Sequence, residues 1–222
     1  MSVPERDDDG YEPPRGGSRE PVFNNIPPGV LLIALPIVVV ALLPFIAPEL
    51  ERWVFAASVV VSPGPGQVAP QQPLGPWAPY LLHILIHFGL LHIAMNLTVL
   101  VSAGRAVGTS FGTDASGTLG FLVFFALCSI AGAAAQVVFS GNEAATMGGA
   151  STGVSGLIAA AGWVMGGYRG MLRLALPWTG LNIVIGIVGI GIPIPIGWVA
   201  HIGGTVAGAV LFPVLQPVFA RR

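Results

Sequence analysis

The chain has 222 residues, of which 54% are hydrophobic and only 9% are charged. This composition excludes an ordinary water-soluble domain, because too few polar side chains are available to cover a hydrated surface. The net charge of -1 and the lack of a basic patch give no sign of nucleic-acid binding. The composition therefore predicts a polytopic membrane protein.

Residues 1–27 form the first predicted segment. Most of this stretch (MSVPERDDDGYEPPRGGSRE) is rich in proline, glycine and acidic residues, so it cannot bury enough apolar area to fold. We expect a disordered acidic tail in the cytoplasm, and the acidic start is unlike a signal peptide. A single cysteine, Cys128, lies in an apolar run, which excludes an internal disulfide and a cysteine-based metal site.

Residues 28–222 are predicted to form one all-α membrane domain. A membrane helix needs roughly 20 mostly apolar residues to cross the hydrocarbon layer, and six segments meet this condition. We place them at about 29–47, 88–107, 117–139, 147–166, 174–192 and 196–218. The last two are separated by Pro193 and Pro195, which must break or kink a helix.

Residues 48–87 are predicted to form a long loop after the first span, on the outer side of the membrane. The run WVFAASVVV (53–61) is too short to cross the membrane, and a proline-rich stretch follows it. The loop is expected to end in a helical stretch, YLLHILIH.

The arginines indicate the orientation, because cytoplasmic loops of membrane proteins carry an excess of positive charge. With the N-terminus in the cytoplasm, only Arg52 falls outside. The arginines that then fall inside are Arg6, Arg15, Arg19, Arg105, Arg169, Arg173, Arg221 and Arg222. We therefore expect a cytoplasmic N-terminus.

Polar side chains gather near the outer ends of three predicted spans. His92 and Asn96 are four residues apart and share a helix face, Ser151 lies in the fourth span, and His201 lies in the sixth. Ser151 and His201 should lie roughly 6–8 Å below the outer surface at 1.5 Å per residue. Polar residues at membrane depth usually mark a site or a pathway.

These residue types can form a serine hydrolase. Serine needs a base to remove its proton, and His201 is the candidate base. His92, Asn96 and the backbone N–H of Ser151 could donate hydrogen bonds to an oxyanion. The three spans contain no Asp or Glu, so the predicted centre is a Ser-His dyad without an orienting carboxylate.

Small residues should bring the fourth and sixth spans together. His201, Gly204 and Gly208 share one face of the sixth span, and Gly149, Gly153, Gly156 and Ala160 give the fourth span a small-residue surface. Missing side-chain bulk lets membrane helices approach closely. Close approach would bring the Ser151 hydroxyl to the His201 imidazole.

Together these residues resemble the rhomboid family of intramembrane serine proteases, over roughly residues 29–218. The likeness rests on the six spans and on three motifs. The motifs are GASxxxxGL at Gly149, Ala150, Ser151, Gly156 and Leu157, HxxxxHxxxN at His87, His92 and Asn96, and HxxGxxxG at His201, Gly204 and Gly208.

The resemblance implies a six-helix rhomboid-like bundle that cleaves other membrane proteins in or near their transmembrane segments, without metal or organic cofactor. It implies Ser151 as nucleophile, His201 as base, and His92 and Asn96 as oxyanion donors. His87 has a supporting role, as do Gly149, Gly204 and Gly208. The expected partners are transmembrane substrates and the lipid bilayer. The expected location is the bacterial inner membrane, with the active site facing outward.

This chain departs from the family pattern after the nucleophile and after the second span, where the family often has Glu and this chain has Gly108. The family usually has glycine after the nucleophile, whereas this chain has Thr152, which could tighten the site. His83 matches no family position, and we interpret it as a polar tip at the membrane interface.

The sequence leaves three alternatives open. Ser155 in GVSG is a rival nucleophile one helical turn from Ser151. A catalytically silent rhomboid-like protein would bind clients without cutting them, although such proteins usually lack the serine or the histidine. A small proton-coupled transporter would need polar residues in the cytoplasmic halves of the spans, which are almost wholly apolar.

Overall fold

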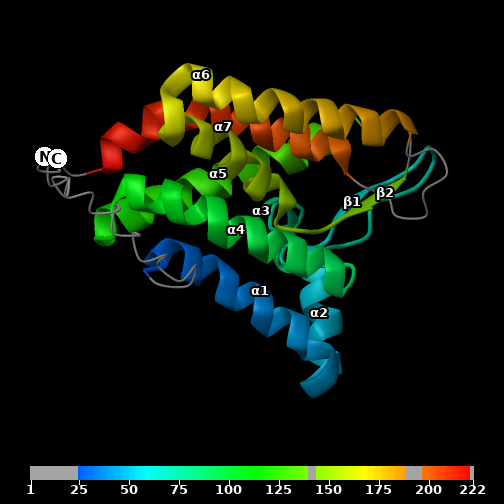
Figure 1. The fold of residues 1–222 in the computed structure, drawn as a ribbon. Coiled ribbons are helices and arrows are strands. Elements are labelled where there is room, and N and C mark those ends of the chain that lie inside the picture. Colours follow the sequence, from blue (N-terminus) through cyan, green and yellow to red (C-terminus); the bar gives the residue numbers. More distant parts are fainter. Residues whose placement is uncertain (1–24, 140–143, 189–196, 221–222) are drawn as a thin grey trace, which may run out of the picture.

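Long helices dominate the computed structural model, which describes residues 25–139, 144–188 and 197–220 (Figure 1). Within these ranges, five helices are long and apolar enough to cross a membrane. They are α1 (Pro28–Ile46), α4 (Leu90–Phe111), α5 (Ala115–Phe139), α6 (Ser151–Val188) and α7 (Trp198–Phe219). The predicted bundle of long apolar helices is therefore confirmed, and the predicted tail lies almost entirely outside the described residues.

Helix α6 consists of two limbs that double back on each other. Its 38 residues are interrupted by non-helical backbone at Gly166 and Gly167, and Gly167 has a φ of +58°. The indole N–H of Trp178 donates to the hydroxyl of Ser155 at 3.1 Å. Residues 23 positions apart on one straight helix would lie roughly 35 Å apart. The first limb (residues 151–165) and the second limb (residues 168–188) are therefore side by side, as Figure 1 shows.

The limbs of α6 correspond to the predicted fourth and fifth spans, with shifted ends. The break matches the expected end at residue 166, but helix resumes at once rather than at residue 174. The first limb begins at Ser151, not at residue 147, because Ala145–Met147 form strand β2. The predicted boundary at Pro193 and Pro195 lies outside the described residues.

The segment between α1 and α4 is folded onto the bundle. It contains α2 (Pro48–Ser58), β1 (Val60–Ser62), α3 (Pro79–Leu82) and the 3₁₀ turn η1 (His83–Leu85). Strand β1 pairs antiparallel with β2, with Val61 opposite Thr146. The pairing ties this segment to the residues just before α6. In Figure 1 the sheet lies at the opposite end of the bundle from the break in α6.

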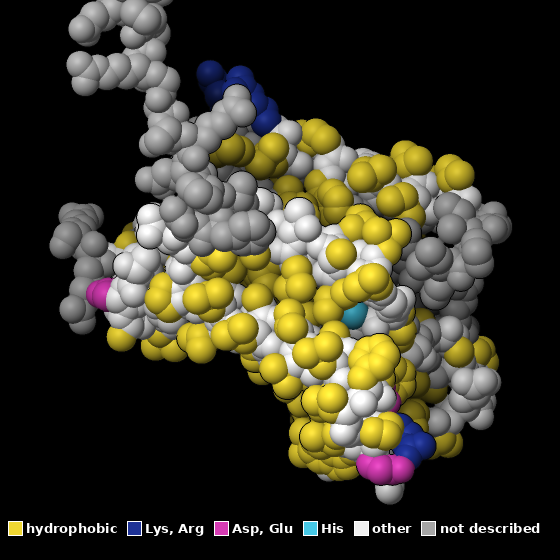
Figure 2. Space-filling view, turned by 60° about the horizontal axis from the view of Figure 1, so that its bottom comes forward, with side chains coloured by type: hydrophobic (Ala, Val, Ile, Leu, Met, Phe, Trp, Pro, Cys, Tyr) yellow, Lys and Arg dark blue, Asp and Glu magenta, His cyan; other side chains and the backbone are white. Residues whose placement is uncertain are grey.

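The bundle has an aromatic core and an apolar outer surface. Phe111, Phe121, Phe124 and Phe212 are buried, and the rings of Phe111 and Phe212 meet edge to face at 5.7 Å between centroids. Figure 2 shows hydrophobic side chains over most of one face, with charged side chains at its margins. An exposed apolar surface of this extent suits contact with lipid.

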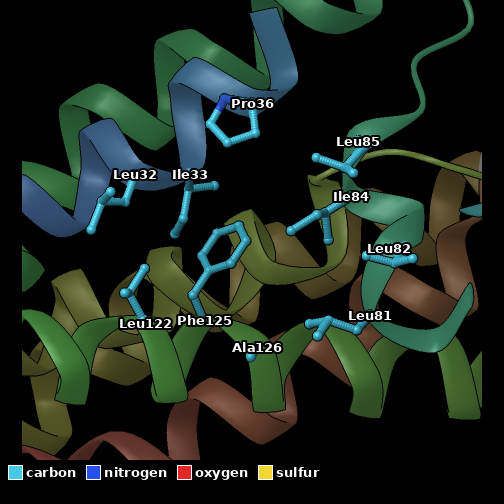
Figure 3. Close-up of a pocket in the computed structure, with 10 residues that line it drawn as sticks. All are labelled: Leu32, Ile33, Pro36, Leu81, Leu82, Ile84, Leu85, Leu122, Phe125 and Ala126. Carbon is cyan, nitrogen blue, oxygen red and sulfur yellow. The ribbon is translucent and has the colours of Figure 1, made fainter. Parts of the chain in front are cut away.

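A largely apolar pocket of about 280 Å³ lies between α1, α5 and the α3–η1 segment. Figure 3 shows Ile33 of α1, Leu85 of η1 and Phe125 of α5 pointing into it. The residues that line it include no serine, histidine or asparagine. This pocket therefore lacks the groups that hydrolysis needs, and the predicted site lies elsewhere.

Candidate active site

A short non-helical segment, Gly148–Ala150, links β2 to the first residue of α6, Ser151. Gly149 has a φ of +131°, a backbone conformation that residues other than glycine rarely adopt. Its N–H donates to the carbonyl oxygen of His83 at 2.8 Å. The N–H of Ala150 donates more weakly to Nε2 of His87, at 3.4 Å. The segment before Ser151 is thus held by residues of the loop after α1.

His92 lies against this segment. A Cβ added to Gly149 would lie 2.9 Å from Nε2 of His92 and 3.4 Å from the hydroxyl oxygen of Ser151. Nδ1 of His92 accepts a hydrogen bond from the N–H of Phe88 at 3.3 Å. A neutral imidazole that accepts at Nδ1 carries its proton on Nε2. The donor of His92 therefore lies on the side of Gly149 and Ser151.

Asn96 and His87 flank His92. Asn96 is buried, and its amide donates to the carbonyl oxygen of His92 at 2.9 Å, while its Oδ1 is buried without a partner in the described structure. The ring of His87 lies 5.0 Å from that of His92 between centroids. His87 lies between η1 and α4, where burial, and secondarily the neighbouring His92, lower the pKa of His87 to about 4. His87 is therefore neutral and can accept from Ala150.

The first limb of α6 touches α7 at backbone distance. A Cβ on Gly204 would lie 2.1 Å from the carbonyl oxygen of Thr152, and one on Gly208 would lie 2.3 Å from that of Gly156. Both pairs advance by four residues in the same direction, so the two helices run parallel. Gly153 instead faces α5, where an added Cβ would meet Phe125. The chain brings His201 and Ser151 to the same end of this helix pair.

His201 is held by the second limb of α6. Its Nδ1 lies 2.6 Å from Oδ1 of Asn182, and its ring stacks on Trp178 with centroids 6.0 Å apart. In the described structure no hydrogen bond joins the Ser151 hydroxyl to His201. Catalytic hydrogen bonds are often long without substrate and shorten in the substrate complex.

Ser155 uses its hydroxyl within the protein. It is fully buried, donates to the carbonyl oxygen of Ser151 at 2.7 Å, and accepts from the indole of Trp178. Both roles of the hydroxyl are therefore occupied. This arrangement favours Ser151 over Ser155 as the nucleophile.

The sequence interpretation missed Asn182 and Trp178. A signal for Asn182 was present, because a strongly polar side chain is costly in an apolar span and needs a partner there. Trp178 gave no such signal, since a tryptophan in a membrane helix is ordinary. Among the described residues, no group of three or more His, Cys, Asp or Glu side chains could hold a metal ion.

The interpretation of His83 as an interfacial polar tip is wrong. His83 is completely buried, and its Nδ1 lies 3.1 Å from the carbonyl oxygen of Pro79. Since that oxygen only accepts, Nδ1 carries the proton, and Nε2 accepts from the Thr152 hydroxyl at 3.0 Å. The threonine after Ser151 thus has a specific partner, and it also packs against Gly132 of α5.

His83 should make the stability of the protein depend on pH. Burial lowers the pKa of His83 from 6.5 to about 4. As the pH falls, His83 of the unfolded chain takes up a proton before His83 of the folded chain does. The contribution of His83 to the free energy of unfolding is therefore complete above about pH 6.5 and is lost toward pH 4. We expect the melting temperature in detergent to fall more steeply on acidification for the parent than for His83→Gln. Parallel pH curves for the two proteins would contradict this expectation.

Comparisons with known proteins show the family to which the chain belongs. The family model described as "Rhomboid domain" matches residues 75–217. The chain is 33% identical over 138 residues to Rhomboid protease GluP of Bacillus subtilis (strain 168). The aligned residues make up 60% of this chain and 25% of that protein. The chain thus matches about a quarter of that relative's length. Because the family model covers more than half of the residues, the chain belongs to the rhomboid family of intramembrane proteases.

Proposed function

We propose that this protein is an intramembrane serine endopeptidase that hydrolyses peptide bonds in or near transmembrane segments of other membrane proteins. One observation carries the proposal: Gly204 lies against Thr152, the residue after Ser151, while Gly149, two residues before Ser151, lies against the donor nitrogen of His92. This supports a serine flanked by a histidine base on α7 and a histidine donor on α4.

In the proposed reaction, the Ser151 hydroxyl attacks the scissile carbonyl while Nε2 of His201 takes its proton. The negative charge on the carbonyl oxygen receives hydrogen bonds from Nε2–H of His92, from the amide of Asn96 and from the backbone N–H of Ser151. His201 then protonates the leaving amine. Water hydrolyses the acyl-enzyme by the same steps in reverse order, with His201 again as base.

We further propose that each limb of α6 crosses the membrane, which gives six crossings with the N-terminus in the cytoplasm. Arg169 and Arg173 lie just after the break in α6 and Arg105 lies toward the end of α4, in support of a cytoplasmic face there. The site would then face the outer side of a bacterial inner membrane. A client-binding protein without catalysis is the alternative, and nothing in the site favours it.

The test is cleavage by the purified protein in liposomes. The substrate is a single-span protein with a fluorescent label on each side of the span, and products are followed by gel and mass spectrometry. We expect cleavage within or beside the span, and labelling of Ser151 by a fluorophosphonate that blocks it. Binding of the substrate without cleavage or labelling would favour the client-binding alternative.

A further inference from the structure

Asn182 joins the second limb of α6 to His201. It is 1% exposed in a limb of mostly apolar residues. Its Oδ1 lies 2.6 Å from Nδ1 of His201, and its Nδ2 donates to the carbonyl oxygen of Trp178 at 2.8 Å. A buried amide with both ends engaged, and one end on the proposed base, is a specific arrangement.

The contact with Trp178 determines which way the amide points. A carbonyl oxygen can only accept, so the NH₂ group of Asn182 must face Trp178. Oδ1 then faces His201, and only a protonated Nδ1 can donate to it. The neutral imidazole therefore carries its proton on Nδ1 and keeps the lone pair on Nε2, which is the form that a general base needs.

Trp178 limits the rotation of the same ring. Its indole is stacked on His201 at 30° between planes, and its own N–H is anchored on Ser155 of the first limb. The hydrogen bond from Nδ1 fixes the tautomer, and the stacked indole fixes the ring plane. Both groups come from one turn of the second limb.

We propose that Asn182 is a positioning residue that holds His201 in the Nδ1–H tautomer with Nε2 available to Ser151. The inference rests on the proposed function, in which His201 is the base. Asn182 occupies the place that a carboxylate holds in a Ser-His-Asp triad, but it supplies orientation without a negative charge. Asn182 is buried and its polar atoms contact His201 and Trp178, so it acts only through His201.

The test compares Asn182→Leu with Asn182→Asp in the liposome cleavage assay. Leucine removes the acceptor, so kcat should fall by about 10²–10⁴-fold, as expected when a catalytic histidine adopts the wrong tautomer. KM should change little, because Asn182 does not contact the substrate. Aspartate keeps an acceptor for Nδ1, and when protonated it can also donate to the Trp178 carbonyl. We expect Asn182→Asp to recover kcat to within about tenfold of the parent.

A control variant and thermal melting separate positioning from folding. Val206→Ala, an exposed position on α7 (57% exposed), should keep the parent kcat. The inference is overturned if Asn182→Leu keeps kcat within a few-fold of the parent. It is also overturned if Asn182→Asp matches the parent in melting temperature yet stays as inactive as Asn182→Leu.

A second measurement does not depend on cleavage. The ¹⁵N shifts of His201 in selectively labelled protein report which ring nitrogen carries the proton. We expect the Nδ1–H form in the parent and loss of that single form in Asn182→Leu. An Nε2–H form in the parent would overturn the inference even if cleavage is normal. If the parent shows the Nδ1–H form but neither cleaves nor labels, the proposed function fails and the positioning contact stands.

Discussion

Replacing Ser151 with alanine is expected to lower kcat for cleavage of a transmembrane substrate by about 10⁴-fold or more, because the proposed nucleophile is lost. His201→Ala should cost about as much, since removing either partner of a serine–histidine pair disables the same step. Ser151→Ala should fold like the parent, because Ser151 is the first residue of α6 and its hydroxyl has no hydrogen-bond partner within the described residues. His201→Ala removes the partner of the buried Asn182, so its melting temperature should fall below that of the parent. The measurement is single-turnover cleavage with matched melting curves.

Ser155→Ala is the comparison that tests the choice of nucleophile. The Ser155 hydroxyl donates to the Ser151 carbonyl and accepts from the Trp178 indole. Its loss should loosen Trp178, which stacks on His201, without removing the proposed nucleophile. We expect a decrease in kcat of no more than about tenfold. Activity that survives in Ser151→Ala but disappears in Ser155→Ala would reverse the assignment.

The family and the all-α membrane fold could be predicted from sequence because their signals are local. Apolar runs of about 20 residues reveal spans wherever they occur. Histidine and serine in such runs are costly to bury, so His92, Ser151 and His201 were visible as candidates without coordinates. The spacing of Gly204 and Gly208 likewise predicted a close helix contact, and the structure shows it against Thr152 and Gly156.

The partners of these residues could not be predicted, because they come from distant parts of the chain. His83 was interpreted as an interfacial side chain because its partner, Thr152, lies 69 residues further along the chain. The sequence shows a polar residue at Asn182, but it does not show that the amide of this residue faces His201. The predicted fourth span included Met147, the last residue of strand β2, because the pairing of β2 with β1 depends on the fold.

Replacing Gly204 with alanine is expected to destabilise the protein by about 1–3 kcal/mol and to lower kcat by about 10²-fold. The added Cβ would lie 2.1 Å from the carbonyl oxygen of Thr152. That oxygen belongs to a helix backbone and cannot rotate away as a side chain could. Helix α7 must therefore move away from the first limb of α6, and this separates His201 from Ser151.

Gly180→Ala is the matched control for this substitution. Gly180 lies in the second limb of α6, and an added Cβ would meet nothing within 4 Å. Alanine is favoured over glycine in a helix interior by about 1 kcal/mol, so this variant should melt at or above the parent temperature with unchanged kcat. The two variants add the same methyl group to helical backbone and differ only in what it meets. Equal behaviour of Gly204→Ala and Gly180→Ala would contradict the close contact of α6 with α7, which is the proposed means of bringing His201 to Ser151.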